Sequence, residues 1–208
     1  MKEIEEAIEK TIETSDLENI NVNLAEVAID SVLEDGVLKD LPIVSIVVGL
    51  SKFGFRLRET IFLKKVLKFL SPLKYTSKVE RQKFLKKIEE SETYNKKVGE
   101  ALIMILDKLT DLDKPKIIGK LFVASIKEEI DYQTFLQLSY LVENLFLPDI
   151  EYLRELNLGN DIELTKREEL YRFGLMKRPA FGKIQVDSAN EYEINDYGKK
   201  LLEIIDKE

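Results

Sequence analysis

Hydrophobic residues recur at helical spacing along most of the chain. In the first stretch, for example, Ile4, Ala7, Ile8 and Ile12 fall on one side of a helix. A run of helices, joined by short polar turns, is therefore expected before Pro148. The predicted helices cover residues 1–14, 22–33, 43–50, 58–73, 77–88, 94–109, 113–126 and 131–145.

The helix over 58–73 has the clearest pattern of the set. Its apolar positions share one face, and its lysines are predicted to share the opposite, solvent-facing side. The inward positions are Phe62, Leu63, Val66, Leu67, Phe69, Leu70 and Leu73, and the outward ones are Lys64, Lys65 and Lys68. Ser71-Pro72 marks the end of this helix or a kink in it.

Several helix starts carry a recognisable signal. Ser77 and Glu80 form a capping box, and a second capping box is expected at Thr165 and Glu168. Pro42, behind Asp40, and Pro115 suit the first turn of a helix.

The pattern changes after Pro148. A short helix over 149–156 and a turn at 158–160 precede a helix over 165–174. Two short strands are expected at 180–186 and 191–194, followed by a helix that Asn195 caps and that buries Leu201, Leu202 and Ile205.

This C-terminal segment contains Gly174-Leu175, the stretch 183–186, and the run Tyr192-Glu-Ile-Asn-Asp-Tyr-Gly-Lys-Lys-Leu-Leu202. These residues resemble the second half of a winged-helix domain, in which a helix ends in Gly-Leu, a two-stranded wing follows, and a capped helix closes the fold. The resemblance implies that Gly198 allows the last helix to pack closely against the hairpin.

The resemblance also implies candidate contacts to nucleic acid, on the third helix and on the wing. These are Lys166, Arg167, Arg172, Lys177, Arg178 and Lys183. Residues 151–208 hold ten Lys/Arg against thirteen Asp/Glu, and this net charge of −3 disfavours phosphate contacts. Winged helices also serve as protein-binding modules, so both roles stay open.

The fold class predicted is mainly α: an N-terminal multi-helix array followed by a winged-helix-like module with one short β-hairpin. The expected domains are residues 1–147 and 148–208, and the helix over 131–147 is available to the second one.

The chain has no cysteine and no histidine. Thiolate nucleophiles, cysteine-ligated metals and histidine-based triads are therefore excluded. We expect no enzyme activity, no catalytic residues, no metal site and no cofactor.

Charge is distributed in blocks. Residues 1–50 hold three Lys/Arg against twelve Asp/Glu, a net of −9, and residues 51–100 hold fourteen against six, a net of +8. The simplest explanation is that the acidic helices lie against the basic ones, or that both faces are solvated. A second is a surface for an anionic partner, built from Lys64, Lys65, Lys68, Arg81, Lys83, Lys86 and Lys87.

A third explanation is a membrane surface, because the apolar stretch 41–50 precedes a basic amphipathic helix. The longest uncharged apolar run has eleven residues, against the roughly 20 that span a bilayer. Residues 1–10 also lack the order of a secretory signal. We therefore expect a cytoplasmic protein.

The order of a helical array and a wing also resembles uncharacterised bacterial and phage proteins, some of them linked to abortive infection of phage-infected cells. The function predicted is a non-enzymatic regulator or adaptor that binds another macromolecule, in the first place a protein. The alternatives are a winged-helix DNA-binding transcriptional regulator and, third, an effector that acts at a membrane surface.

Overall fold

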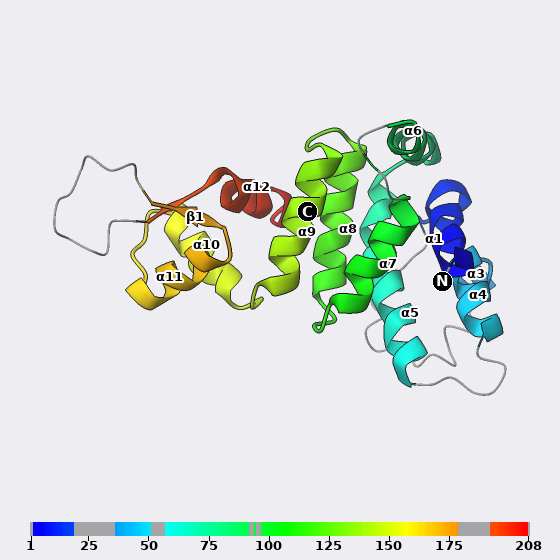
Figure 1. Ribbon diagram of the computed structural model, residues 1–208, viewed down its shortest axis with the longest axis horizontal. Helices are drawn as coiled ribbons and strands as arrows, with labels where there is room; N and C mark the ends of the chain where they lie inside the picture. The colour runs from blue at the N-terminus through cyan, green and yellow to red at the C-terminus, as the bar shows by residue number, and fades with distance from the viewer. Residues whose placement is uncertain are drawn as a thin grey trace. The chain divides into compact units, whose positions relative to one another are not determined.

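The computed structural model (Figure 1) describes residues 2–18, 36–50, 57–91, 94, 97–178 and 192–207. The chain is mainly α-helical, with a two-stranded antiparallel sheet near the C-terminus, as the sequence predicts. It divides into two compact units, Met1–Tyr132 and Gln133–Glu208. The predicted helix over 22–33 lies outside the described residues.

Unit 1 is built from helices. They are α1 (Lys2–Thr14), α3 (Gly36–Lys39), α4 (Pro42–Leu50), α5 (Leu57–Leu70), the 3-10 helix η2 (Ser71–Tyr75), α6 (Lys78–Glu89), α7 (Val98–Lys108) and α8 (Lys114–Ile126). Helix α1 packs against α4, α6 and α7, whereas α5 packs against α8 and η2. The acidic first helix therefore lies beside α3 and α4 in unit 1 and also contacts α6 and α7 (Figure 1).

The inward face predicted for α5 is confirmed, except that Phe62 is only half-buried. The helix ends at Leu70, and Ser71 and Pro72 form the start of the 3-10 helix η2. The outward position predicted for Lys65 is wrong: this residue is buried, and its Nζ donates a 3.0 Å hydrogen bond to the carbonyl oxygen of Asp107. That carbonyl lies in the last turn of α7, where helix carbonyls lack partners within the helix.

Aromatic rings connect the layers of the core of unit 1. Phe69 of α5 meets Phe122 of α8 with ring centroids 5.5 Å apart, and Phe84 of α6 contacts Phe122 edge-on at 5.3 Å. Phe84 in turn contacts the ring of Tyr132 at 6.0 Å. Such tilted and edge-to-face pairs add to the free energy gained by burying the rings.

Of the two capping boxes that the sequence predicts, one forms and the other does not. At Ser77 the capping box is confirmed: the Glu80 amide donates to the Ser77 hydroxyl, and the Ser77 amide donates to the Glu80 carboxylate at 2.7 Å. The capping box expected at Thr165 is wrong, because helix α11 begins at Leu164 and Thr165 is already inside it. An N-cap needs a residue with non-helical backbone angles.

Unit 2 contains the C-terminal helices and the sheet. Its elements are α9 (Tyr132–Asn144, the first residue belonging to unit 1), α10 (Asp149–Asn157), α11 (Leu164–Arg172), β1 (Met176–Lys177), β2 (Glu193–Ile194) and α12 (Asp196–Ile205). The strands pair antiparallel, with Met176 opposite Ile194 and Lys177 opposite Glu193. The strand predicted at 180–186 lies outside the described residues.

Asn195 joins the sheet to α12. Its side-chain oxygen accepts from the Gly198 amide at 2.9 Å, and its amide group donates to the Gly174 carbonyl at 2.8 Å. A Cβ atom on Gly198 would lie 2.5 Å from the carbonyl oxygen of Leu175, so only glycine allows this close approach. The predicted cap and close packing are confirmed, but Ile204 is the buried residue, and Ile205 is half-buried.

Candidate functional site

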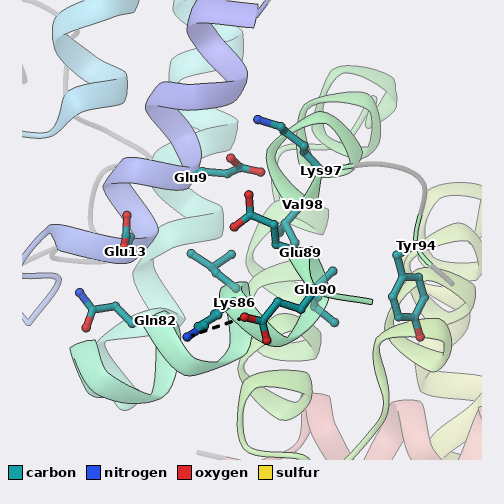
Figure 2. A pocket seen from close by; sticks show the side chains of 11 residues that line it. Glu9, Glu13, Gln82, Lys86, Glu89, Glu90, Tyr94, Lys97 and Val98 are labelled. Atoms are coloured by element: carbon teal, nitrogen blue, oxygen red, sulfur yellow. Dashed lines mark ion pairs between the residues drawn. The ribbon is translucent and has the colours of Figure 1, made fainter. Parts of the chain in front are cut away.

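An open groove of about 970 Å³ lies between α1, α6 and α7 of unit 1 (Figure 2). Its side chains combine carboxylates, an apolar patch, and a tyrosine. The lining residues are Glu9 and Glu13 of α1, Gln82, Leu85, Lys86, Ile88 and Glu89 of α6, Glu90, Tyr94 and Lys97 of the connection, and Val98 of α7.

Helical spacing brings these side chains together. Glu9 and Glu13 are four residues apart and therefore share a face of α1. On α6, Gln82, Leu85 and Glu89 stand at positions i, i+3 and i+7, which also form one stripe. Figure 2 shows the Glu9 carboxylate projecting from α1 toward the side of the groove where Glu89 lies. The groove is thus formed by two helix faces that meet at the start of α7.

Glu9 also fixes the start of α7. Its Oε1 accepts a 2.8 Å hydrogen bond from the backbone amide of Gly99, in the first turn of that helix. The N-cap residue, Lys97, makes no side-chain capping bond. The Glu9 carboxylate of α1 therefore supplies a hydrogen-bond acceptor for the Gly99 amide, which has no acceptor within α7. A Cβ on Gly99 would lie 2.4 Å from the carbonyl oxygen of Glu5, so the glycine lets α1 and α7 approach this closely.

The apolar part of the groove comes from α6 and α7. Ile88 and Val98 are buried, and Leu85 is half-buried. Tyr94 forms one end, and its ring meets the ring of Tyr132 edge-on with centroids 4.9 Å apart. Burial raises the pKa of Tyr132 well above its ordinary value, so this supporting phenol stays neutral. The end of the groove therefore rests on the aromatic core.

The carboxylates of the groove are only partly neutralised. Lys86 pairs with Glu90 at 3.7 Å, and both side chains are largely exposed, so this pair is weak. No cation in the described part of the chain pairs with Glu13 or Glu89. Glu9 uses one oxygen on a backbone amide and not on a cation. The described lining thus holds four glutamates, Glu9, Glu13, Glu89 and Glu90, against two lysines, Lys86 and Lys97, which leaves a net negative charge.

The proposed cationic surface of residues 64–87 is not a continuous surface. Arg81 is buried and donates to backbone carbonyls, and Lys65 is buried as described above. Lys68 has a side chain that is only 13% exposed and pairs with Asp113 at 2.8 Å. Lys87 pairs with Glu128 at 2.7 Å, which lowers the pKa of that carboxyl. Of the remaining three, Lys86 makes the pair with Glu90, Lys64 is half-buried and Lys83 is exposed.

The candidate nucleic-acid contacts in unit 2 are also divided. Arg167 is buried and pairs with Asp161, and its guanidinium donates to the carbonyl of Tyr192. Lys166 binds the carboxylates of Asp149, at 3.2 Å, and Glu169, at 2.7 Å, and these hydrogen bonds raise its pKa. Both of these candidate nucleic-acid contacts therefore form ion pairs within unit 2.

Three of the other candidates are exposed. Arg178 lies over the rings of Tyr171 and Tyr192, about 5 Å from each ring centroid, and donates to the Tyr192 hydroxyl at 2.6 Å. Arg172 is exposed, and Lys177 lies 3.9 Å from Glu193. Lys183 lies outside the described residues.

Within the ranges that the structure describes, no group of three or more acidic side chains is arranged to hold a metal ion. Over the same residues, no helix combines the length and the apolar character needed to cross a bilayer.

The sequence pattern does not predict the groove. Glu9 and Glu13 stood out only as part of an acidic helix, and Tyr94 was predicted inside a helix that in fact begins at Val98. The available signal was the i, i+4 pair Glu9 and Glu13 on α1 and the adjacent Glu89 and Glu90 at the C-terminal end of α6. Neither signal indicates which helices pack against each other.

Comparison with protein-family models, curated proteins and solved structures gives no match to this chain.

Proposed function

We propose that the protein is a non-enzymatic binding protein whose groove between α1, α6 and α7 takes a segment of another protein. The observation that carries this proposal is the chemistry of the groove lining. A groove with apolar lining residues and charged groups on its edges is typical of sites that recognise peptide segments. Half-buried Leu85 and the buried residues Ile88 and Val98 supply the apolar lining, and Glu9, Glu13 and Glu89 supply the edge.

Two contacts hold parts of the groove in place. The Glu9–Gly99 hydrogen bond holds α1 against α7, and the Tyr94–Tyr132 contact anchors one end on the core. A site that is ordered before binding loses less conformational entropy when a partner binds. This favours a binding role for the groove in the unliganded protein.

A peptide library displayed on phage and selected on the immobilised full chain tests the proposal. Enriched peptides are then measured against Leu85→Asn, which makes the floor polar, and Gln82→Trp, which fills the groove. The matched control is Leu57→Asn, the same change at a residue that is 75% exposed on α5 and outside the groove. Circular dichroism verifies that each variant folds.

We expect affinity to fall about tenfold or more in both groove variants, the size of a lost apolar contact, and to stay within twofold in the control. Failure to enrich any peptide above the blank surface, or equal binding to the groove variants and wild type, would overturn the proposal.

A second candidate function is nucleic-acid binding by unit 2, and the stacking of Arg178 on two tyrosines favours it. This guanidinium is held in place close to the sheet, where it can meet a phosphate without first being ordered. Binding to random duplex DNA over a salt series tests this function, with Arg172→Gln/Arg178→Gln as the variant. No binding at low salt, where phosphate contacts are strongest, contradicts it.

A further inference from the structure

We infer that the segment bound in the groove is cationic: a short stretch with lysine or arginine facing the α1–α6 edge and with apolar side chains on Leu85, Ile88 and Val98. This inference rests on the proposed function, and it adds the chemical class of the partner. It follows from the excess of negative charge in the groove lining, where four glutamates stand against two lysines, Lys86 and Lys97.

Glu13 and Glu89 are exposed carboxylates on facing helices, and neither has a described cation within ion-pair distance. Glu9 directs one oxygen to the Gly99 amide. Like charges held on neighbouring helices repel each other, and a cation placed among them removes that repulsion. An acidic partner would add to the repulsion, and a neutral one would leave it unchanged.

The length of the site limits the partner. The stripe on α6 runs from Gln82 to Glu89, about 10 Å at a helical rise of 1.5 Å per residue. About two turns of helix or three to four extended residues span this distance. One or two cationic side chains and one or two apolar ones are therefore sufficient to occupy it.

The test uses three labelled twelve-residue peptides with the same leucine positions and with lysine, glutamine or glutamate at the others. Fluorescence anisotropy measures their binding to the full chain. We expect the lysine peptide to bind at least tenfold more tightly than the glutamine peptide, and the glutamate peptide to bind most weakly.

Net charge alone attracts a lysine peptide, because the chain carries a formal charge of −7. The test therefore compares Glu13→Gln/Glu89→Gln with Glu3→Gln/Glu18→Gln. The second pair removes the same charge at exposed residues of unit 1 outside the groove. We expect the groove variant to lose about tenfold in affinity for the lysine peptide, and the control less than twofold.

Equal losses in the two double variants would show attraction to the whole protein and would overturn the inference. Equal or tighter binding of the glutamine or glutamate peptide, or no binding of the lysine peptide, would overturn it too. If library peptides still require Leu85, the proposed function survives that result. A groove filled by a second copy, seen as a dimer that Glu13→Gln/Glu89→Gln dissociates, would also contradict it.

The Gly99 amide gives an independent readout by NMR. A cation drawn to Glu9 changes the hydrogen bond that this amide donates, so the lysine peptide should shift the Gly99 resonance more than those of Gly159, Gly174 and Gly198. A shift confined to those three glycines would place the peptide on unit 2 and contradict the inference.

Discussion

Arg81 Nε donates a 2.6 Å hydrogen bond to the carbonyl oxygen of Ile12, 69 residues earlier in the chain. The same guanidinium donates to the carbonyls of Ser15 and Thr76, both at 2.7 Å. Ile12 and Ser15 lie at the C-terminal end of α1, where carbonyls lack partners and the helix dipole favours a cation. Arg81 thus caps α1 from α6.

Replacing Arg81 should destabilise unit 1 strongly. Burial already lowers the pKa of this guanidinium, and Arg81→Met leaves three carbonyls without their donor. We expect a loss of about 3 kcal/mol in the free energy of unfolding, measured by urea denaturation. Lys83→Met on the same helix, at an exposed position, should change it by less than about 0.5 kcal/mol. Similar losses in both variants would contradict the structural role of Arg81.

The sequence predicted the helices of unit 1 better than the surroundings of their charges. Apolar spacing identified the buried face of α5, because burial of that face determines the pattern. The same spacing places Arg81, Lys65 and Arg167 on polar positions, where a solvated cation is the usual outcome. Each is buried because it meets backbone carbonyls of a distant segment. That pairing depends on tertiary contacts and leaves no periodic signal.

Thr11 links α1 to α4, and its hydroxyl should be needed for stability. The buried hydroxyl donates to the Ala7 carbonyl at 2.7 Å and accepts from the Ile43 amide, at the start of α4, at 3.0 Å. Thr11→Val keeps the shape and removes the acceptor. We expect a loss of roughly 1–2 kcal/mol in the free energy of unfolding, the usual cost of a lost N-terminal cap.

The control for Thr11 lies one turn further along. Thr14 makes the same bond back to the helix, to the Lys10 carbonyl at 2.7 Å, but it is exposed and caps no other element. Thr14→Val should therefore change stability by only a few tenths of a kcal/mol. Equal effects of the two substitutions would show that the bond to Ile43 does not matter.

Two helical glycines of unit 1 should respond to alanine with opposite signs. A Cβ on Gly119 of α8 would lie 2.3 Å from the carbonyl oxygen of Phe69, so Gly119→Ala must separate α5 from α8. We expect a loss of about 2 kcal/mol or more. A Cβ on Gly49 of α4 would meet nothing within 4 Å, and Gly49→Ala should add about 0.5–1 kcal/mol. The midpoint temperatures of thermal unfolding of both variants measure these changes. A stabilising effect of Gly119→Ala would contradict the close packing of α5 on α8.

The groove shows the limit of sequence reasoning for the site. Its charge could be suspected from the acidic first fifty residues, but those residues were equally consistent with an acidic helix lying against a basic one. Two facts create the groove: α1 packs against both α6 and α7, and Glu9 caps α7 through Gly99. Both are relations between segments far apart in sequence, 90 residues in the case of Glu9 and Gly99, and no local pattern predicts them.

The capping box of α6 makes stability depend on pH in a predictable direction. The Ser77 amide and then the Ser77 hydroxyl donate to Glu80, and these bonds lower the pKa of that carboxyl from its ordinary value of 4.5. A lowered folded-state pKa means that the stabilisation is present above pH 4.5 and is lost as the pH falls through the folded-state pKa.

Glu80→Gln isolates this contribution. Glutamine keeps a hydrogen-bond acceptor but no charge, so wild type should exceed the variant by roughly 0.5–1 kcal/mol at pH 7. The difference should shrink steadily below pH 4.5, because the protonated glutamate then resembles glutamine. Urea denaturation of both proteins between pH 7 and pH 3 measures it. A difference that stays constant over this range would mean that the charge of Glu80 does not act through the capping box, and a difference that grows on acidification would reverse the predicted linkage.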